Sequence, residues 1–353
     1  FHSTSPSSPN VDRTPTIFFN ASNVAIYQFK HSAGPGIPLF DNDFDSVGEW
    51  TTITPTTFST YFFWKFKDHT SAKLNNIAGT HTFQIRGYDS SGQVTATDSI
   101  DYTVIKTNYT AVTDTNLTTA INLWFSDEAS ATSTYGHIRD WDVSGVTDME
   151  GAFQNRWTFD EDLSTWDVSN VTNMKNMFSG TSTNISGTLE GFDCDLQYWD
   201  TSNVTDMSFM FSGNQKFNGK VGNWDVSSVT DMTAMFKNNY LFNQDLSDWD
   251  TSAVTNMSSM FNYAMVFNQD IGDWDTSAVT NMYQMFQRAY QFDNNGQPMD
   301  WTVSSVTTMY GMFTDDSNFN RDLSGWDVSA VTSYGSFDSG CTSWAASNKP
   351  TFS

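Results

Sequence analysis

The chain has 353 residues, which is enough for two domains, and 16% of them are aromatic. Its formal net charge of −24 is unevenly divided: residues 1–115 carry 7 Lys/Arg and 10 Asp/Glu (−3), whereas residues 116–353 carry 9 and 30 (−21). Such acidity repels nucleic acid and anionic membranes, and no apolar run reaches the roughly 18 residues of a membrane span, so neither nucleic-acid binding nor direct membrane insertion is expected.

The first 16 residues read as an extended tail, because Pro6, Pro9 and Pro15 stand among Ser and Thr residues. Two placements are open for this tail. It can add as a strand to the open edge of a neighbouring copy, which would build a head-to-tail filament. Alternatively, it packs back on the domain that follows it.

An all-β domain is predicted for residues 17–106. Apolar and polar residues alternate in residues 58–66, 83–85 and 100–104, with a turn signal at Asp89–Gly92. The stretch GTHTFQIRGYDSSGQVTATDSIDYTVI resembles the last hairpin of immunoglobulin-like modules in bacterial and protist surface proteins. That resemblance implies one immunoglobulin-like β-sandwich.

Residues 107–135 are predicted to be a linker and an N-terminal cap helix. Apolar residues from Leu117 to Trp124 recur at helical spacing, and Asn116 is placed to cap the first turn. A helix here would cover the first unit of the array that follows, whose strand edges would otherwise be exposed.

The phrase W-D-[V/T]-S-x-V-T-x-M recurs eight times in the rest of the chain, at spacings of 25, 33, 25, 25, 25, 27 and 25 residues. A period of this length is typical of solenoids, propellers and arrays. Extra residues lie around Gly180–Glu190 and Asn294–Met299, and the last copy replaces two Met by Tyr334 and Phe337. The copies begin at Trp141, Trp166, Trp199, Trp224, Trp249, Trp274, Trp301 and Trp326.

Eight apolar positions recur in most copies, and we predict that they form the repeat core. One unit of 25 residues is too small to fold alone, so stacked units must share apolar surface. We predict two short strands and a tight helical turn per unit, with Asp225 and Ser227 capping a corner. The Asn or Asp after the second Phe is predicted to form an internal polar ladder. In the fourth copy the core positions are Trp224, Val229, Met232, Met235, Phe236, Phe242, Leu246 and Trp249.

The phrases NVTDMSFMFSG, FNQDLSDWDTSAVTNM and STYGHIRDWDVSGVTDM resemble the BspA-like leucine-rich-repeat surface proteins. The resemblance covers about Asn116 to Trp344. It implies a right-handed solenoid of about eight coils over residues 136–345, with a C-terminal tail at 346–353. It also implies exposure outside the cell and no catalytic residues.

Catalytic signals are lacking. The repeated Asp residues are periodic, whereas catalytic residues are normally singular, and no phosphate loop, nucleophile elbow or zinc motif is present. We therefore expect a protein that is not an enzyme and has no resident cofactor. Calcium stays open, because Asp41, Asp43 and Asp45 are acidic at alternate positions, and a second acidic group lies at residues 160–162 with Asp193 and Asp195.

Other surface features are weaker. The two cysteines, Cys194 and Cys341, fall in units too far apart to form a disulfide with each other. The column of Thr residues resembles an ice-binding face, but the residue two positions on is an apolar Met, which leaves a single rank. Seven glycosylation sequons occur, at Asn20, Asn108, Asn116, Asn170, Asn184, Asn203 and Asn256, with Asn184 and Asn108 the most favoured.

Together these features predict a non-enzymatic extracellular structural or adhesive glycoprotein, with self-assembly into a surface filament or coat as one form that this role can take. Its partners would be copies of itself or other surface proteins. The alternative is a cell-surface recognition module that binds a carbohydrate or protein ligand on the solenoid face, with or without calcium.

Overall fold

The computed structural model describes residues 109–180 and 191–352 in full, together with the backbone of seven strands between residues 2 and 104. The chain divides into two compact units, Phe1–Thr110 and Ala111–Ser353. Among the described residues, no helix has both the length and the apolar character that crossing a membrane requires.

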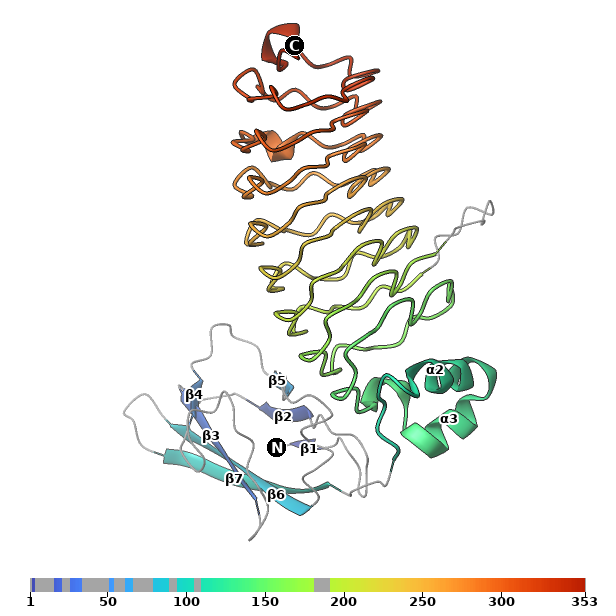
Figure 1. Cartoon of the computed structure of the whole chain (residues 1–353). Coiled ribbons are helices and arrows are strands. Elements are labelled where there is room, and N and C mark those ends of the chain that lie inside the picture. The colour runs from blue at the N-terminus through green and yellow to red at the C-terminus, as the bar shows by residue number, and fades with distance from the viewer. Residues whose placement is uncertain are drawn as a thin grey trace. The chain divides into compact units, whose positions relative to one another are not determined.

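The first unit contains two antiparallel sheets (Figure 1). One has the strand order β1-β2-β5 and the other β4-β3-β6-β7. The predicted hairpin is present, since β6 pairs with β7 from Gly79↔Val104 to Tyr88↔Val94. The immunoglobulin-like sandwich itself stays a prediction. The strands are β1 (His2–Ser3), β2 (Thr16–Asn20), β3 (Ile26–Ala33), β4 (Thr51–Ile53), β5 (Tyr61–Lys65), β6 (Gly79–Tyr88) and β7 (Val94–Val104).

The second unit begins with two helices, α2 (Leu117–Ser126) and α3 (Glu128–Tyr135). As the apolar spacing predicted, α2 buries Leu117, Ala120, Ile121 and Trp124. The predicted cap is wrong in its chemistry. Asn116 occupies the N-cap position, but its side chain bonds backward, accepting from the Thr113 N–H and donating to the Ala111 carbonyl.

Beyond the helices, the chain winds in successive coils that lie one above another (Figure 1). We number coils 1 to 8 from the tryptophans at 141, 166, 199, 224, 249, 274, 301 and 326, and call the whole the coil stack. A single parallel bridge joins each coil to the next, as between Asp206 and Asp231. The same register recurs between all neighbouring coils, so the repeat in the sequence is a repeat in space. Its assignment as a right-handed leucine-rich-repeat solenoid stays a prediction.

The local structure of a coil differs from the prediction of two strands and a helical turn. Each coil has one bridge, no second strand lies at residues 242–249, and residues 233–238 form consecutive turns. The reason is backbone conformation: Ala234 and Asn238 have φ of 52° and 56°, which interrupts any regular helix. Alternate N–H groups therefore donate to the next coil, from Met232 to the carbonyl of Asn256 and from Phe236 to that of Met260.

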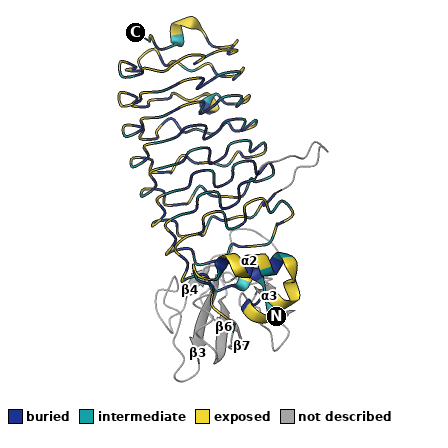
Figure 2. Cartoon of the chain, turned by 45° about the vertical axis from the view of Figure 1, so that its right-hand side comes forward, coloured by how far each residue is buried: buried dark blue, intermediate teal, exposed yellow. Residues whose placement is uncertain are grey.

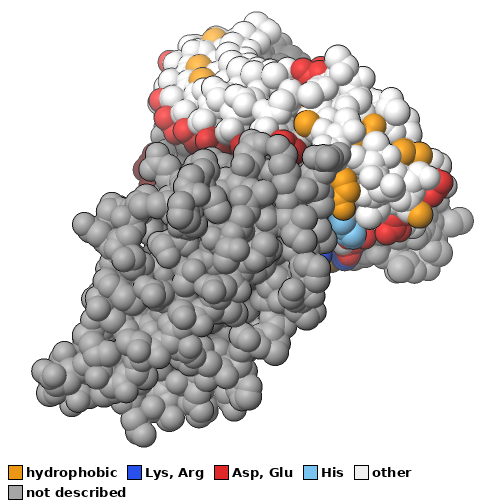
Figure 3. All heavy atoms as spheres, turned by 90° about the horizontal axis from the view of Figure 1, so that it is seen from below, with side chains coloured by type: hydrophobic (Ala, Val, Ile, Leu, Met, Phe, Trp, Pro, Cys, Tyr) orange, Lys and Arg blue, Asp and Glu red, His pale blue; other side chains and the backbone are white. Residues whose placement is uncertain are grey.

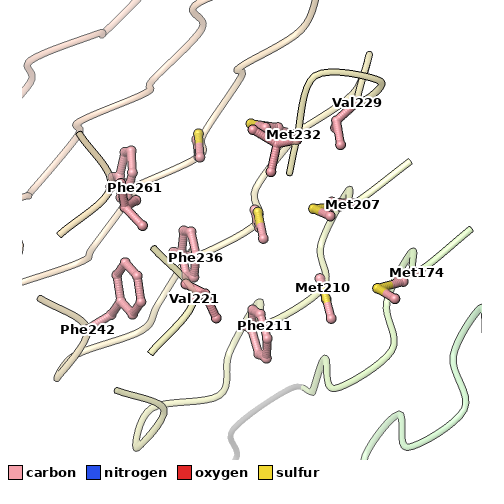
Figure 4. Close-up of a cluster of buried hydrophobic side chains, with 14 of the residues drawn as sticks. Met174, Met207, Met210, Phe211, Val221, Val229, Met232, Phe236, Phe242 and Phe261 are labelled. Carbon is pink, nitrogen blue, oxygen red and sulfur yellow. The ribbon is translucent and has the colours of Figure 1, made fainter. Parts of the chain in front are cut away.

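Columns of Met, Phe and Trp fill the interior of the stack. Figure 4 shows part of the Met and Phe columns, and Figure 2 shows that buried residues recur in each coil. The eight apolar side chains of the fourth copy, from Trp224 to Trp249, are each at most 3% exposed. Aromatic rings stack from coil to coil, as Phe211 does on Phe236, with ring centroids 5.8 Å apart at 7°. The core is therefore continuous along the stack, and an inner coil depends on both neighbours.

Tryptophan also has a polar role that the sequence analysis did not predict. The indole Nε1 of Trp224 donates to the carbonyl of Leu196 at 2.8 Å, and that of Trp249 donates to Val221 at 3.1 Å. Each of the seven repeat tryptophans from coil 2 onward makes this bond to a carbonyl that lies two or three residues before the preceding repeat tryptophan. The indole thus satisfies a buried acceptor at a bend of the chain.

Both ends of the stack have closing structures. At the first end, Trp124 of α2 meets Trp141 and His137 edge-on, at centroid distances of 6.2 and 4.9 Å. At the last end, Trp344 lies edge-on to Phe313 and Phe319. His137, four residues before Trp141, thus contacts the cap helix just ahead of the first coil.

Candidate functional site

The periodic polar side chains of the coil stack are hydrogen-bonded to its own backbone. In every coil except coil 7, which has Thr302 at this position, a corner Asp accepts from the Ser two residues later, as Asp225 does from the N–H (3.0 Å) and hydroxyl (2.6 Å) of Ser227. These bonds lower the pKa of Asp225. The conserved geometry from coil to coil gives the repeated Asp residues a structural role as corner caps.

A threonine column runs along one exposed face. The hydroxyl of Thr230 donates to the carbonyl of Thr205 at 3.2 Å, and the same bond recurs along the column up to Thr332. In coil 1 the preceding carbonyl is replaced by Asp114, whose carboxylate accepts from the Thr147 N–H (2.8 Å) and hydroxyl (2.7 Å). These bonds lower the pKa of Asp114. Met149, two residues after Thr147, is buried, so the exposed Thr residues form a single row, as the sequence predicted.

The Asn/Asp ladder exists, but it is not internal. Each side-chain oxygen accepts from the backbone N–H at the same position in the next coil, as Asn218 does from Asn243 at 2.9 Å. The residues are half-buried or exposed, so water can also reach them. The ladder lies on the rim because the neighbouring positions, such as Gln244 and Asp245, face outward too.

The candidate calcium residues divide between the two units. Asp41, Asp43 and Asp45 lie outside the described residues. Within the described part of the chain, no group of three or more His, Cys, Asp or Glu side chains has metal-binding geometry. Asp193 and Asp195 instead accept backbone N–H groups of coil 3, from Asn218 and Lys220.

The two cysteines are free thiols, and burial raises the pKa of each to about 12. Cys341 donates its thiol to the carbonyl of Phe313 near the last end of the stack. Both thiols are therefore protonated at neutral pH, which makes them poor nucleophiles.

The sequons differ in how their amides are used. Nδ2, the atom that glycosylation would modify, donates to a backbone carbonyl in Asn116, Asn170 and Asn203. Asn256 forms a bridge residue between coils. Asn20 ends β2, and Asn108 and Asn184 lie outside the described residues. Glycosylation stays a prediction for all seven.

A groove crosses coils 1 to 4, on the side of the stack where residues with positive φ, such as Asn176 and Phe209, recur. Its volume is about 460 Å³, which is within the range of small-ligand sites. Its floor is backbone held by the coil-to-coil bonds, such as those from Gly180 to Ser212 (2.8 Å) and from Gly213 to Lys237 (2.7 Å). The groove is lined by Gln154, Asn155, Asn176, Ser179, Gly180, Phe209, Ser212, Gly213, Gln215, Lys237, Asn238 and Tyr240.

Two glycines let the coils approach at the groove. A Cβ added to Gly213, which has φ of 76°, would lie 1.9 Å from the carbonyl oxygen of Gly180. A Cβ added to Gly180 would lie 1.9 Å from the ring of Trp157. A larger residue at Gly213 would push the second and third coils apart, and one at Gly180 would displace Trp157 of the first coil, so the shape of the groove depends on both glycines.

The groove is rich in side-chain amides. Gln215 is only 9% exposed and forms part of the groove wall. The amides of Gln154 and Asn176 are held in place through Ser179, whose hydroxyl lies 3.2 Å from each. Amides that line a concave surface can both donate hydrogen bonds to a polar ligand and accept them from it.

The groove also differs from the rest of the stack in charge. Acidic side chains are spread over the described surface in Figure 3, with few basic ones among them. Among the described residues that line the groove there is no Asp or Glu. Six of the nine Lys/Arg after residue 115 pair with Asp, but Lys237 in the groove has no ion-pair partner among the described residues.

Sequence reasoning did not find the groove, because it is built where the copies differ. Gln215, Tyr240, Met265 and Tyr290 occupy the same position in successive coils, so no single residue type marks the site. The one available signal was the extra segment after Gly180, which breaks the repeat beside the groove.

A family model described as "Mycoplasma protein of unknown function, DUF285" matches residues 119–193, 183–298 and 270–349. Taken together, these ranges cover about two thirds of the chain. No curated protein and no solved structure matches the sequence.

Proposed function

The chain belongs to the DUF285 family, whose function is unknown, and we propose that it is a non-enzymatic adhesive protein of the cell exterior. In this proposal the coil stack is a BspA-like leucine-rich-repeat solenoid, and an immunoglobulin-like sandwich precedes it. The stack is a rigid scaffold, and the groove across coils 1 to 4 is its recognition site.

The observation that carries this proposal is the contrast between the groove and the periodic side chains. Corner Asp, ladder Asn and column Thr residues are already bonded to the backbone of the stack. The groove instead offers polar groups that are unpaired among the described residues, on a backbone fixed by inter-coil bonds. Preorganised concave surfaces of this kind favour binding, because little conformational entropy is lost when the ligand arrives.

Adhesion can be tested with beads that carry the purified full chain and with intact cells of the source organism. We expect the beads to attach to the cells, and an antibody against the chain to label unpermeabilised cells. Ser212→Trp, which fills the groove, should reduce attachment, whereas Gln291→Trp, at an exposed position outside it, should not. Attachment that is equal for both variants would contradict a role of the groove in adhesion.

A second function, self-assembly, is favoured by the backbone at the two ends of the stack. In coil 8 the N–H groups of Tyr334, Ser336 and Gly340 have no acceptor among the described residues, although the equivalent groups of coil 7 donate to coil 8. In coil 1 the carbonyls of Asp148 and Glu150 have no donor there. The free N–H groups of coil 8 and the free carbonyls of coil 1 have the same spacing along the chain. The last coil of one copy could therefore hydrogen-bond to the first coil of another, as neighbouring coils do within the stack.

Light scattering coupled to size-exclusion chromatography over a hundredfold range of concentration tests self-assembly. A mass that rises with concentration, and that Ser336→Pro keeps at the monomer value, supports edge pairing, because proline has no N–H to donate. Removal of residues 1–16 separates this from strand addition by the tail. A constant monomer mass for the unaltered chain would exclude both forms of assembly.

A further inference from the structure

We propose that the groove across coils 1 to 4 binds an uncharged oligosaccharide. The inference rests on the proposed adhesive function and names the class of its ligand. Three features of the groove select that class: its hydrogen-bonding groups, its aromatic rings and its charge.

The hydrogen-bonding groups suit a ligand that is covered with hydroxyls. A primary amide both donates and accepts, and so does a sugar hydroxyl, so each can satisfy the other from either side. Gln215 and the half-buried Asn238 both line the groove, and the side-chain amide of Asn238 has no hydrogen-bond partner among the described residues. A ligand hydroxyl in the groove could donate to either amide or accept from it.

The aromatic rings suit the apolar face of a sugar ring. Phe209 and Tyr240 are half-buried side chains that line the groove from coils 3 and 4. Phe209 has φ of 59°, a conformation unfavourable for a large side chain, yet it places the ring at the surface instead of in the core. Flat rings beside convergent amides bind a ligand that is polar at its edge and apolar on its face.

The charge balance argues against acidic glycans. The groove contains Lys237 without an ion-pair partner among the described residues, but this single cation stands in a unit with a formal charge of −21 over residues 116–353. A polyanion would be repelled on approach. The ammonium can still donate three hydrogen bonds to hydroxyls. The four coils give a length of roughly 14 Å at about 4.8 Å per coil, which exceeds one sugar ring.

The test begins with the purified full chain on a printed array of neutral, uronic and sulfated glycans. The best neutral binder is then titrated calorimetrically against three variants. Tyr240→Ala and Gln215→Ala alter the groove. Tyr290→Ala is the matched control, because Tyr290 occupies the same position as Tyr240 two coils later and lies outside the groove. Thermal melts of all three establish that each is folded.

We expect binding to neutral glycans, a loss of affinity of about tenfold or more in each groove variant, and unchanged affinity in Tyr290→Ala. No binding to any neutral glycan, tighter binding to sulfated ones, or equal affinities of the Tyr240 and Tyr290 variants would overturn the proposal. If the beads described above still adhere through the groove while no glycan binds, the ligand class is wrong and the adhesive function stands. If neither occurs, both are wrong.

Discussion

Replacement of Trp249 tests whether the indoles hold the coils together through both packing and hydrogen bonding. Trp249 is 3% exposed and stacks on Trp274, with ring centroids 6.1 Å apart at 7°. Its Nε1 donates to the carbonyl of Val221 at 3.1 Å. Trp249→Ala removes the ring and leaves the carbonyl unpaired, whereas Trp249→Phe keeps a ring and loses only the hydrogen bond and part of the volume.

The expected magnitudes differ between the two variants. Truncation of a large buried aromatic side chain lowers the free energy of unfolding by about 3–5 kcal/mol. Loss of the partner of a buried carbonyl costs about 1–3 kcal/mol, which sets the scale for Trp249→Phe. Trp326 is the comparison, because it is 9% exposed and belongs to the last coil, with a longer bond of 3.2 Å to Met299. Each change should therefore cost less at Trp326.

Urea unfolding followed by circular dichroism measures these differences in the full chain, and hydrogen exchange locates them. Increased exchange should appear in coils 4 to 6 for Trp249→Ala and at the last end for Trp326→Ala. Equal and small losses for both variants would refute the reasoning. So would a Trp249→Phe variant as stable as the unaltered chain, since the indole bond would then contribute nothing.

Four further substitutions test the regions near the two ends of the stack. Asp114→Ala should lower the free energy of unfolding by about 1 kcal/mol at pH 7. Because folding lowers the pKa of the Asp114 carboxyl, this loss should vanish below the folded-state pKa, as urea titrations at several pH values would show. Burial raises the pKa of Asp316 to about 8, so the folded state keeps a proton between pH 4 and 8 and stability should fall by up to about 1.4 kcal/mol per pH unit across that window. Asp316→Asn should abolish this slope. Ser336→Gly should raise the melting temperature, because Ser336 has φ of 58°, whereas Gly340→Ala should lower it, because the added Cβ would lie 2.4 Å from Asp315.

Features that recur with the repeat period could be predicted from the sequence, whereas features that depend on backbone conformation could not. Apolar columns such as Met232 and Phe236 recur with little change, and the side chains of both are fully buried. The Asn ladder was predicted for the same reason, although its exposure was wrong, because a repeated polar residue does not say whether water reaches it. The indole bond was missed because the tryptophan pattern indicates burial alone.

Left-handed residues and the groove escaped prediction for a different reason. One left-handed position holds Asn176, Phe209, Ala234, Ser259 and Gln284 in successive coils, all with φ between 50° and 59°. Such variety shows that the inter-coil bonds impose the conformation whatever the side chain prefers. Residue propensities therefore do not predict this backbone conformation. They also do not predict a surface, such as the groove, whose shape depends on that conformation.

Because the coils are held together by hydrogen bonds and packing among themselves, the residues on one surface can differ from coil to coil while the fold is kept. Core columns and backbone ladders supply the stability, so the outward side chains between them are free to vary from coil to coil. In coils 1 to 4, the described residues that line the groove include no Asp or Glu, and side-chain amides and aromatic rings lie near Gly180 and Gly213. At the same positions in later coils, Arg288 pairs with Asp315 and Asn262 with Gln287. Those coils pair their polar side chains with one another, whereas the side chains of Lys237 and Asn238 in the groove have no partner among the described residues.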